Sequence, residues 1–174
     1  FSWHENLEYT YPHWLYDVMI YFIYHLGGMF GIYLSTCLLA IILGITIYKV
    51  NSKLAKNKVI SFFITIGVMY LLRDYITARA QLVTFILFII EIFCIEKLIE
   101  TNKKSYGLAL IIISILIANL HVAVWPFMFV LYLPYIVEYI MAIFEEHIAK
   151  KYGREVKQGE KVLITKQKGV KTLI

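Results

Sequence analysis

The sequence is short of charge and of the motifs that mark soluble enzymes. Only 17% of its 174 residues are charged, whereas 60% are hydrophobic and the mean hydropathy is +0.71. It contains no nucleotide-binding glycine loop, no GxGxxG, no HExxH and no internal repeat. A soluble domain is only about half apolar, so this composition excludes an ordinary soluble enzyme. It predicts an all-α, polytopic transmembrane helix bundle with no nucleic-acid partner.

Cysteine and secretion signals are scarce as well. The two cysteines, Cys37 and Cys94, fall at different depths of different predicted membrane helices, so a disulfide between them is not expected. No basic region followed by an apolar core and a small-residue cleavage site opens the chain. Because the first residue is Phe1, we expect the natural start to lie upstream of it.

Five apolar stretches dominate the chain, and each approaches the length of about 20 residues that a helix needs to cross a bilayer. They are residues 29–48, 59–72, 82–98, 106–120 and 127–144. A shorter helix from Pro12 to Leu26 is rich in aromatic residues and is expected to lie in the headgroup region, ending at Gly27 and Gly28. The chain therefore divides into an extracytoplasmic segment with an interfacial helix (1–26), a transmembrane bundle (27–147) and a basic cytoplasmic tail (148–174).

The basic residues give the bundle an orientation. Of the 17 lysines and arginines, four lie at 49–58, three at 97–104 and eight at 150–171. With five alternating spans these groups share one side of the membrane, which the positive-inside rule makes cytoplasmic. The other two basic residues, Arg73 and Arg79, then lie outside.

Polar residues from three separate segments meet on the predicted outer side. Those expected to bind substrate are Arg73, Arg79, Gln81, Asn119 and His121. Arginine favours phosphate because its guanidinium binds it bidentately, and Arg79 opens a helix whose N-terminus attracts anions. His121 is suited to act as acid, base or phosphate donor, or simply as a hydrogen-bonded interfacial histidine. A wetted rim with an Arg–Asp74 ion pair is the alternative interpretation of the whole group.

A second polar group belongs to the N-terminal segment. It comprises His4, Glu5, His13 and Asp17, which would shape an acceptor side or hold a divalent metal. His13 and Asp17 are four residues apart and share a helix face. Chance produces such pairs often, so no metal is assigned and the cofactor is left open. His25, beside the glycine pair, is interpreted as structural.

Two carboxylates, Glu91 and Glu138, fall inside predicted spans. An ionisable group in a membrane is a functional hypothesis by default, and helix-to-helix hydrogen bonding or a protonated acid is the alternative. Gly27, Gly31 and Ser35 have the small-xxx-small spacing that suits close helix packing.

Three runs of the sequence carry a resemblance to a known family. PHWLYDVMIYFIYHLGGMFGIYL, RAQL and NLHVAVWPF resemble the N-terminal transmembrane module of GT-C-fold glycosyltransferases of prokaryotes, over residues 1 to about 145. The family usually has proline where this chain has Ala80 in the arginine turn. Its acidic residue of the first outer loop, the expected catalytic residue, would lie before Phe1.

The resemblance implies an enzyme of the prokaryotic cytoplasmic membrane with its site facing outside. The donor would be a polyprenyl-phosphate-linked sugar, and the other partners would be membrane lipids. Two further functions stay open from the residues alone. One is a proton-coupled transporter or lipid-linked-sugar flippase using Glu91 and Glu138. The other is a non-catalytic scaffold of envelope assembly.

Overall fold

The computed structural model describes residues 13–151, and every regular element within them is a helix. The elements are α1 (Trp14–Ala55), α2 (Lys58–Leu72), η1 (Arg73–Tyr75), α3 (Ala80–Thr101), α4 (Lys104–Leu120), η2 (Val122–Val124) and α5 (Phe127–Lys151). The all-α prediction is therefore confirmed for this part of the chain. Predictions that involve His4, Glu5 or the tail beyond Lys151 lie outside the described residues.

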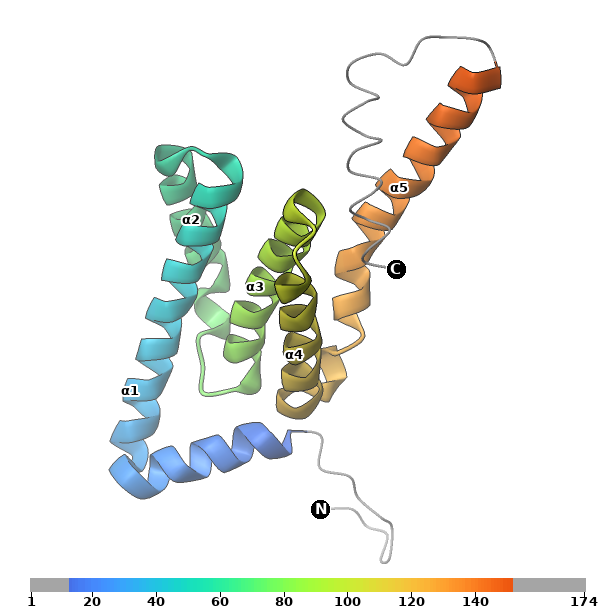
Figure 1. The fold of residues 1–174 in the computed structure, drawn as a ribbon. Coiled ribbons are helices and arrows are strands. Elements are labelled where there is room, and N and C mark those ends of the chain that lie inside the picture. The colour runs from blue at the N-terminus through green and yellow to red at the C-terminus, as the bar shows by residue number, and fades with distance from the viewer. Residues whose placement is uncertain (1–12, 152–174) are drawn as a thin grey trace, which may run out of the picture.

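α1 is two helices joined by a sharp bend at Gly28. The backbone there has φ 57° and ψ −150°, a combination that is essentially restricted to glycine because a side chain would be strained. The part before the bend lies across one end of the bundle, and the part after it runs along the bundle (Figure 1). The predicted break of an interfacial helix at Gly27-Gly28 is thus a real bend.

The small residues near this bend differ in their contacts. A Cβ on Gly31 would lie 2.9 Å from the carbonyl oxygen of Ile23, so glycine at this position allows a close contact between the two parts of α1. A Cβ on Gly27 would meet no described atom within 4 Å. Within the described residues, close helix packing therefore occurs at Gly31 and not at Gly27.

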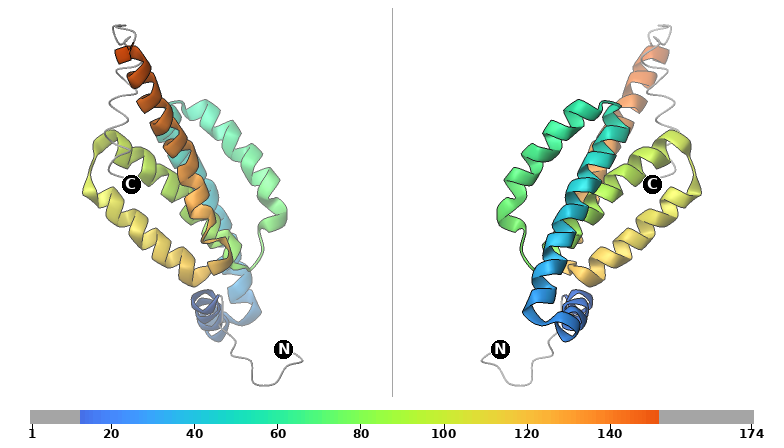
Figure 2. Two further views of the ribbon diagram at one scale, coloured as in Figure 1. Left: turned by 90° about the vertical axis from the view of Figure 1, so that its right-hand side faces the viewer. Right: turned by 90° about the vertical axis from the view of Figure 1, so that its left-hand side faces the viewer.

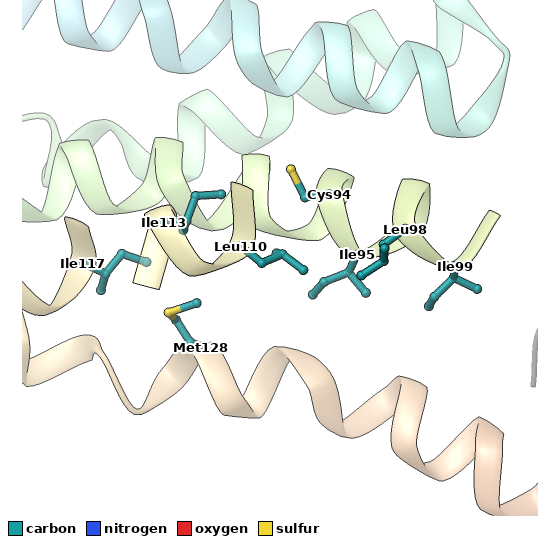
Figure 3. Packing of buried hydrophobic residues seen from close by; sticks show 8 residues of the cluster. All are labelled: Cys94, Ile95, Leu98, Ile99, Leu110, Ile113, Ile117 and Met128. Carbon is teal, nitrogen blue, oxygen red and sulfur yellow. The ribbon is translucent and has the colours of Figure 1, made fainter. Parts of the chain in front are cut away.

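α3 is the centre of the bundle, with α1 and α2 on one side and α4 and α5 on the other (Figures 1 and 2). On the first side, Leu82 and Ile86 of α3 are buried against Leu43 and Ile47 of α1. On the second, residues of α3 and α4 form a buried cluster that Met128 of α5 completes (Figure 3). Beyond Gly28 the helices alternate in direction, so their turns gather at two ends (Figure 1).

The outward faces of the bundle are apolar. Phe62 and Phe63 on α2, Ile41 on α1, and Val137 and Ile140 on α5 all point away from the core. Two stretches of the described chain, Trp14–Ala55 and Val122–Glu145, are long and apolar enough to cross a membrane, and α4 is a shorter apolar helix. An apolar surface of this extent is what a lipid environment requires of a helix bundle.

Candidate functional site

Most of the predicted site residues lie at one end of the bundle. Here the first part of α1 crosses beneath the start of α3 and the end of α4, and the chain turns through η2 into α5 (Figures 1 and 2). We call this the polar end and define it by residues 13–17, 79–84 and 119–125. The opposite end contains the turns after Ala55 and Thr101, and we call it the lysine end (Figure 1).

An apolar contact fixes the first part of α1 to the polar end. Tyr16 of α1, Ala80 of α3 and Leu120 of α4 form a buried cluster, although they are far apart in the sequence. Ala80 is the position where the GT-C pattern has proline, and here its small side chain is only 5% exposed in that contact. This cluster brings α3 and α4 together at the point where their polar residues begin.

Asn119 is engaged in the same contact. Its side-chain oxygen accepts a hydrogen bond of 2.9 Å from the indole Nε1 of Trp14, and its Nδ2 donates to the carbonyl of Ile115 at 2.7 Å. Both ends of the amide are therefore occupied. Asn119 helps to position the crossing helix through these bonds, and its amide retains one N–H and one lone pair for a further contact.

His121 is a buried polar residue of the polar end, at 8% exposure. Its ring centroid lies 4.8 Å from that of His13, and its Nδ1 lies 3.4 Å from the hydroxyl of Thr84. That hydroxyl also donates to the carbonyl of Ala80 at 2.9 Å, and it has only one hydrogen. When that hydrogen is directed to Ala80, a hydrogen bond between Thr84 and His121 requires the tautomer with the proton on Nδ1, in which the Nε2 lone pair is available as an acceptor.

Burial lowers the pKa of His121, and the neighbouring His13 lowers it further. Both effects disfavour the charged imidazolium, the first by desolvation and the second by repulsion between like charges. His121 is consequently a neutral hydrogen-bonding residue at neutral pH. Thr84, which fixes its orientation, was not singled out from the sequence, because a threonine inside an apolar helix gives no signal of its partner.

Arg73 and Arg79 differ in their surroundings. The Nε of Arg73 lies 3.6 Å from Asp74 Oδ1, and its guanidinium lies over the ring of Tyr70 at 4.7 Å. Arg73 therefore has the ion pair of the alternative interpretation, although such an exposed pair contributes only about 0–1 kcal/mol. Within residues 13–151, Arg79 forms no hydrogen bond or ion pair through its side chain.

Arg79 occupies the N-cap of α3 with an extended backbone, φ −133° and ψ 155°, and its side chain is exposed. The residues that follow it, Ala80 and Gln81, begin the helix with backbone N–H groups that have no intrahelical acceptor. These groups give the helix N-terminus a partial positive charge. Arg79 and the start of α3 thus combine two sources of positive potential at the same end of the bundle as the His13–His121 pair.

The predicted metal side is only partly described. Asp17 lies one turn after His13, and its N–H donates to the His13 carbonyl at 3.1 Å. Across residues 13–151, no group of three or more histidine, cysteine or acidic side chains is arranged to hold a metal ion. His25 is exposed and stacks on Tyr21 at 6.2 Å between centroids.

The two carboxylates inside the helices lie away from the polar end and differ from each other. Glu91 of α3 is fully buried, and neither of its oxygens has a hydrogen-bond partner among residues 13–151. Glu138 of α5 is half-buried. A third carboxylate, Glu96, accepts a hydrogen bond of 2.9 Å from the hydroxyl of Tyr135, an interhelical contact that the sequence did not indicate.

No protein-family model, curated protein or solved structure matches this chain. Its function is therefore argued from the polar end and the surface of the bundle.

Proposed function

We propose that the chain is an integral membrane protein of the prokaryotic cytoplasmic membrane with five spans, namely the part of α1 after Gly28 and the helices α2 to α5. The arrangement of charge supports this topology. Lysines of the described chain gather at the lysine end, whereas Arg73 and Arg79 lie toward the opposite end. By the positive-inside rule the lysine end is cytoplasmic and the polar end extracytoplasmic.

The polar end binds a polyprenyl-phosphate-linked sugar. The observation that carries this proposal is Arg79, an arginine without a partner among the described residues, at the N-terminus of α3. In the proposed topology this position lies at the level of the membrane surface. A lipid phosphate can reach this position from the side of the bundle while its chain stays on the apolar outer surface. The guanidinium supplies a bidentate contact and the helix N-terminus adds positive potential.

Sugar transfer at this site is the activity we propose, as in the GT-C glycosyltransferases that the sequence resembles. Arg79 stabilises the charge that develops on the leaving phosphate, and Arg73 contributes less because Asp74 offsets part of its charge. The Nε2 lone pair of His121 accepts a hydrogen bond from a sugar hydroxyl.

Binding of a polyprenyl-phosphate lipid to the purified protein tests the proposal. We expect Arg79→Ala to weaken binding by about 10- to 100-fold, since hydrogen bonds to charged groups contribute about 1.5–3 kcal/mol each. Arg79→Lys should recover only part of this loss, because lysine keeps the charge but not the planar fork.

Arg73→Ala is the matched control, since this arginine lies in the same turn but is paired with Asp74, and it should cost less affinity. Equal affinity of the wild type and all three variants would remove Arg79 from any phosphate site. The helix end would then be ordinary exposed structure.

A further inference from the structure

Glu91 occupies an unusual position for a carboxyl group. It lies in α3, one helical turn from Leu87, Cys94 and Ile95, and therefore shares their face. That face belongs to the apolar cluster between α3, α4 and α5, whose other members are aliphatic residues such as Ile113 and Met128 (Figure 3). Glu91 is 0% exposed, and neither carboxyl oxygen has a hydrogen-bond partner in the described part of the chain.

An ionised carboxylate in such surroundings would be strongly disfavoured. Moving the charged carboxylate from water into the bundle costs free energy. Among the described residues, no arginine, lysine or backbone N–H faces the carboxylate to offset that cost. The titratable groups near enough to interact with Glu91 are Tyr132 of α5 and Cys94 of α3, and both are neutral. The described residues of α1, α2 and α4 bring no charge to it. A bound proton is what makes the group compatible with its site.

α5 is the neighbour best able to respond if that proton leaves. Pro134 lies inside α5 and lacks the N–H that would bond the carbonyl one turn earlier, so the helix has a built-in weak point. Beyond this proline, Tyr135 is fixed to Glu96 of α3 by its hydroxyl. Before it, the hydroxyl of Tyr132 makes no hydrogen bond to a described residue, although it lies within electrostatic range of Glu91.

We propose that Glu91 is a proton-binding site inside the bundle, and that release of its proton to water draws the Tyr132 hydroxyl into a hydrogen bond with the carboxylate. The neighbouring Tyr135–Glu96 bond joins the same two helices with the same chemistry. The segment Phe127–Leu133 then repacks against α3 about the weak point at Pro134. This inference is independent of the phosphate site at the polar end.

Infrared spectroscopy of the protein in lipid vesicles tests the bound proton. At neutral pH we expect the carbonyl band of a protonated carboxylic acid, which disappears as the pH is raised and is absent from Glu91→Gln. The control is Glu100→Gln, since Glu100 is exposed and paired with Lys97, and this variant should retain the band. A wild type without a Glu91-dependent band at neutral pH would overturn the proposal.

Two further measurements test the role of Tyr132 and α5. Tyr132→Phe removes the donor for the ionised carboxylate, so the band should persist to higher pH than in the wild type. The rate of hydrogen exchange in a peptide spanning residues 127–133 should change with pH more in the wild type than in Glu91→Gln. The two proteins are compared at equal pH, so that the intrinsic pH dependence of exchange is the same in both. Indistinguishable titrations, or indistinguishable exchange at every pH, would refute the coupling between Glu91 and α5.

Discussion

Replacing Gly28 by alanine tests whether the bend in α1 positions the polar end. Gly28 has φ 57° and ψ −150°, and a residue with a Cβ is strained by about 1–3 kcal/mol at these backbone angles. Its Cβ would meet no atom within 4 Å, so the penalty comes from the backbone alone. The chain could avoid it only by straightening α1 at residue 28.

Straightening would cost at least as much as the strain. It would expose Tyr16, a large side chain that is 7% exposed and whose burial contributes about 1.5–3 kcal/mol. It would also break the Trp14–Asn119 hydrogen bond, which contributes about 0.5–1.5 kcal/mol. We therefore expect Gly28→Ala to keep the bend and to lower the free energy of unfolding by about 1–3 kcal/mol.

Gly27→Ala is the matched control. Gly27 has a helical backbone without positive φ, and a Cβ there would meet open space. Alanine at this position should stabilise the protein by up to about 1 kcal/mol, because it is the better helix former. The two variants would be compared by reversible denaturation in mixed micelles, which yields the free energy of unfolding.

Spin labels at exposed positions Met19 and Thr77 would report whether the crossing helix stays in place, in a background without Cys37 and Cys94. The distance distribution of Gly28→Ala should resemble that of the wild type, with broadening at most. Equal stability of the Gly27→Ala and Gly28→Ala variants would refute the reasoning, since it would mean that residue 28 has no special backbone conformation.

Two further predictions follow from the ends of the bundle. With the native cysteines removed, an impermeant thiol reagent applied to intact cells should label Thr77→Cys but not Ala55→Cys, and the reverse pattern would invert the proposed topology. The pKa of His121 is lowered in the folded state, so the unfolded state binds more protons as the pH falls through the ordinary histidine value of about 6.5. Thermal stability should therefore decrease as the pH falls through this value. His121→Gln should reduce this dependence whereas exposed His25→Gln should not, and equal slopes for both variants and the wild type would contradict the burial of a neutral imidazole.

Much of the fold was predictable because its causes are local. Each predicted apolar stretch lies in one of the long helices α1 to α5. The start of α2, the end of α4 and the start of α5 agree with the predicted boundaries within one residue. The bend at Gly28 was predictable for the same reason, since glycine alone tolerates its backbone conformation. α5 continues beyond the predicted apolar stretch 127–144, as far as Lys151.

The partners of the site residues were not predictable, because they come from distant parts of the chain. Nothing near Asn119 in sequence indicates that its amide is occupied by Trp14, which is 105 positions away. The sequence also left open which of Arg73 and Arg79 would pair with Asp74, and only the structure shows that Arg73 does.

Composition and periodicity by themselves determined that this chain is helical and apolar, with its basic residues divided between two ends. Those properties depend on each residue's own chemistry and on neighbours within one or two helical turns. Tertiary structure decided which polar groups are satisfied and which are not. Packing of α1, α3 and α4 at Tyr16, Ala80 and Leu120 encloses His121, and packing of α3 against α4 and α5 leaves Glu91 buried without a partner. Burial and hydrogen bonding depend on the atoms that surround a group in space, and helix packing alone brings those atoms together.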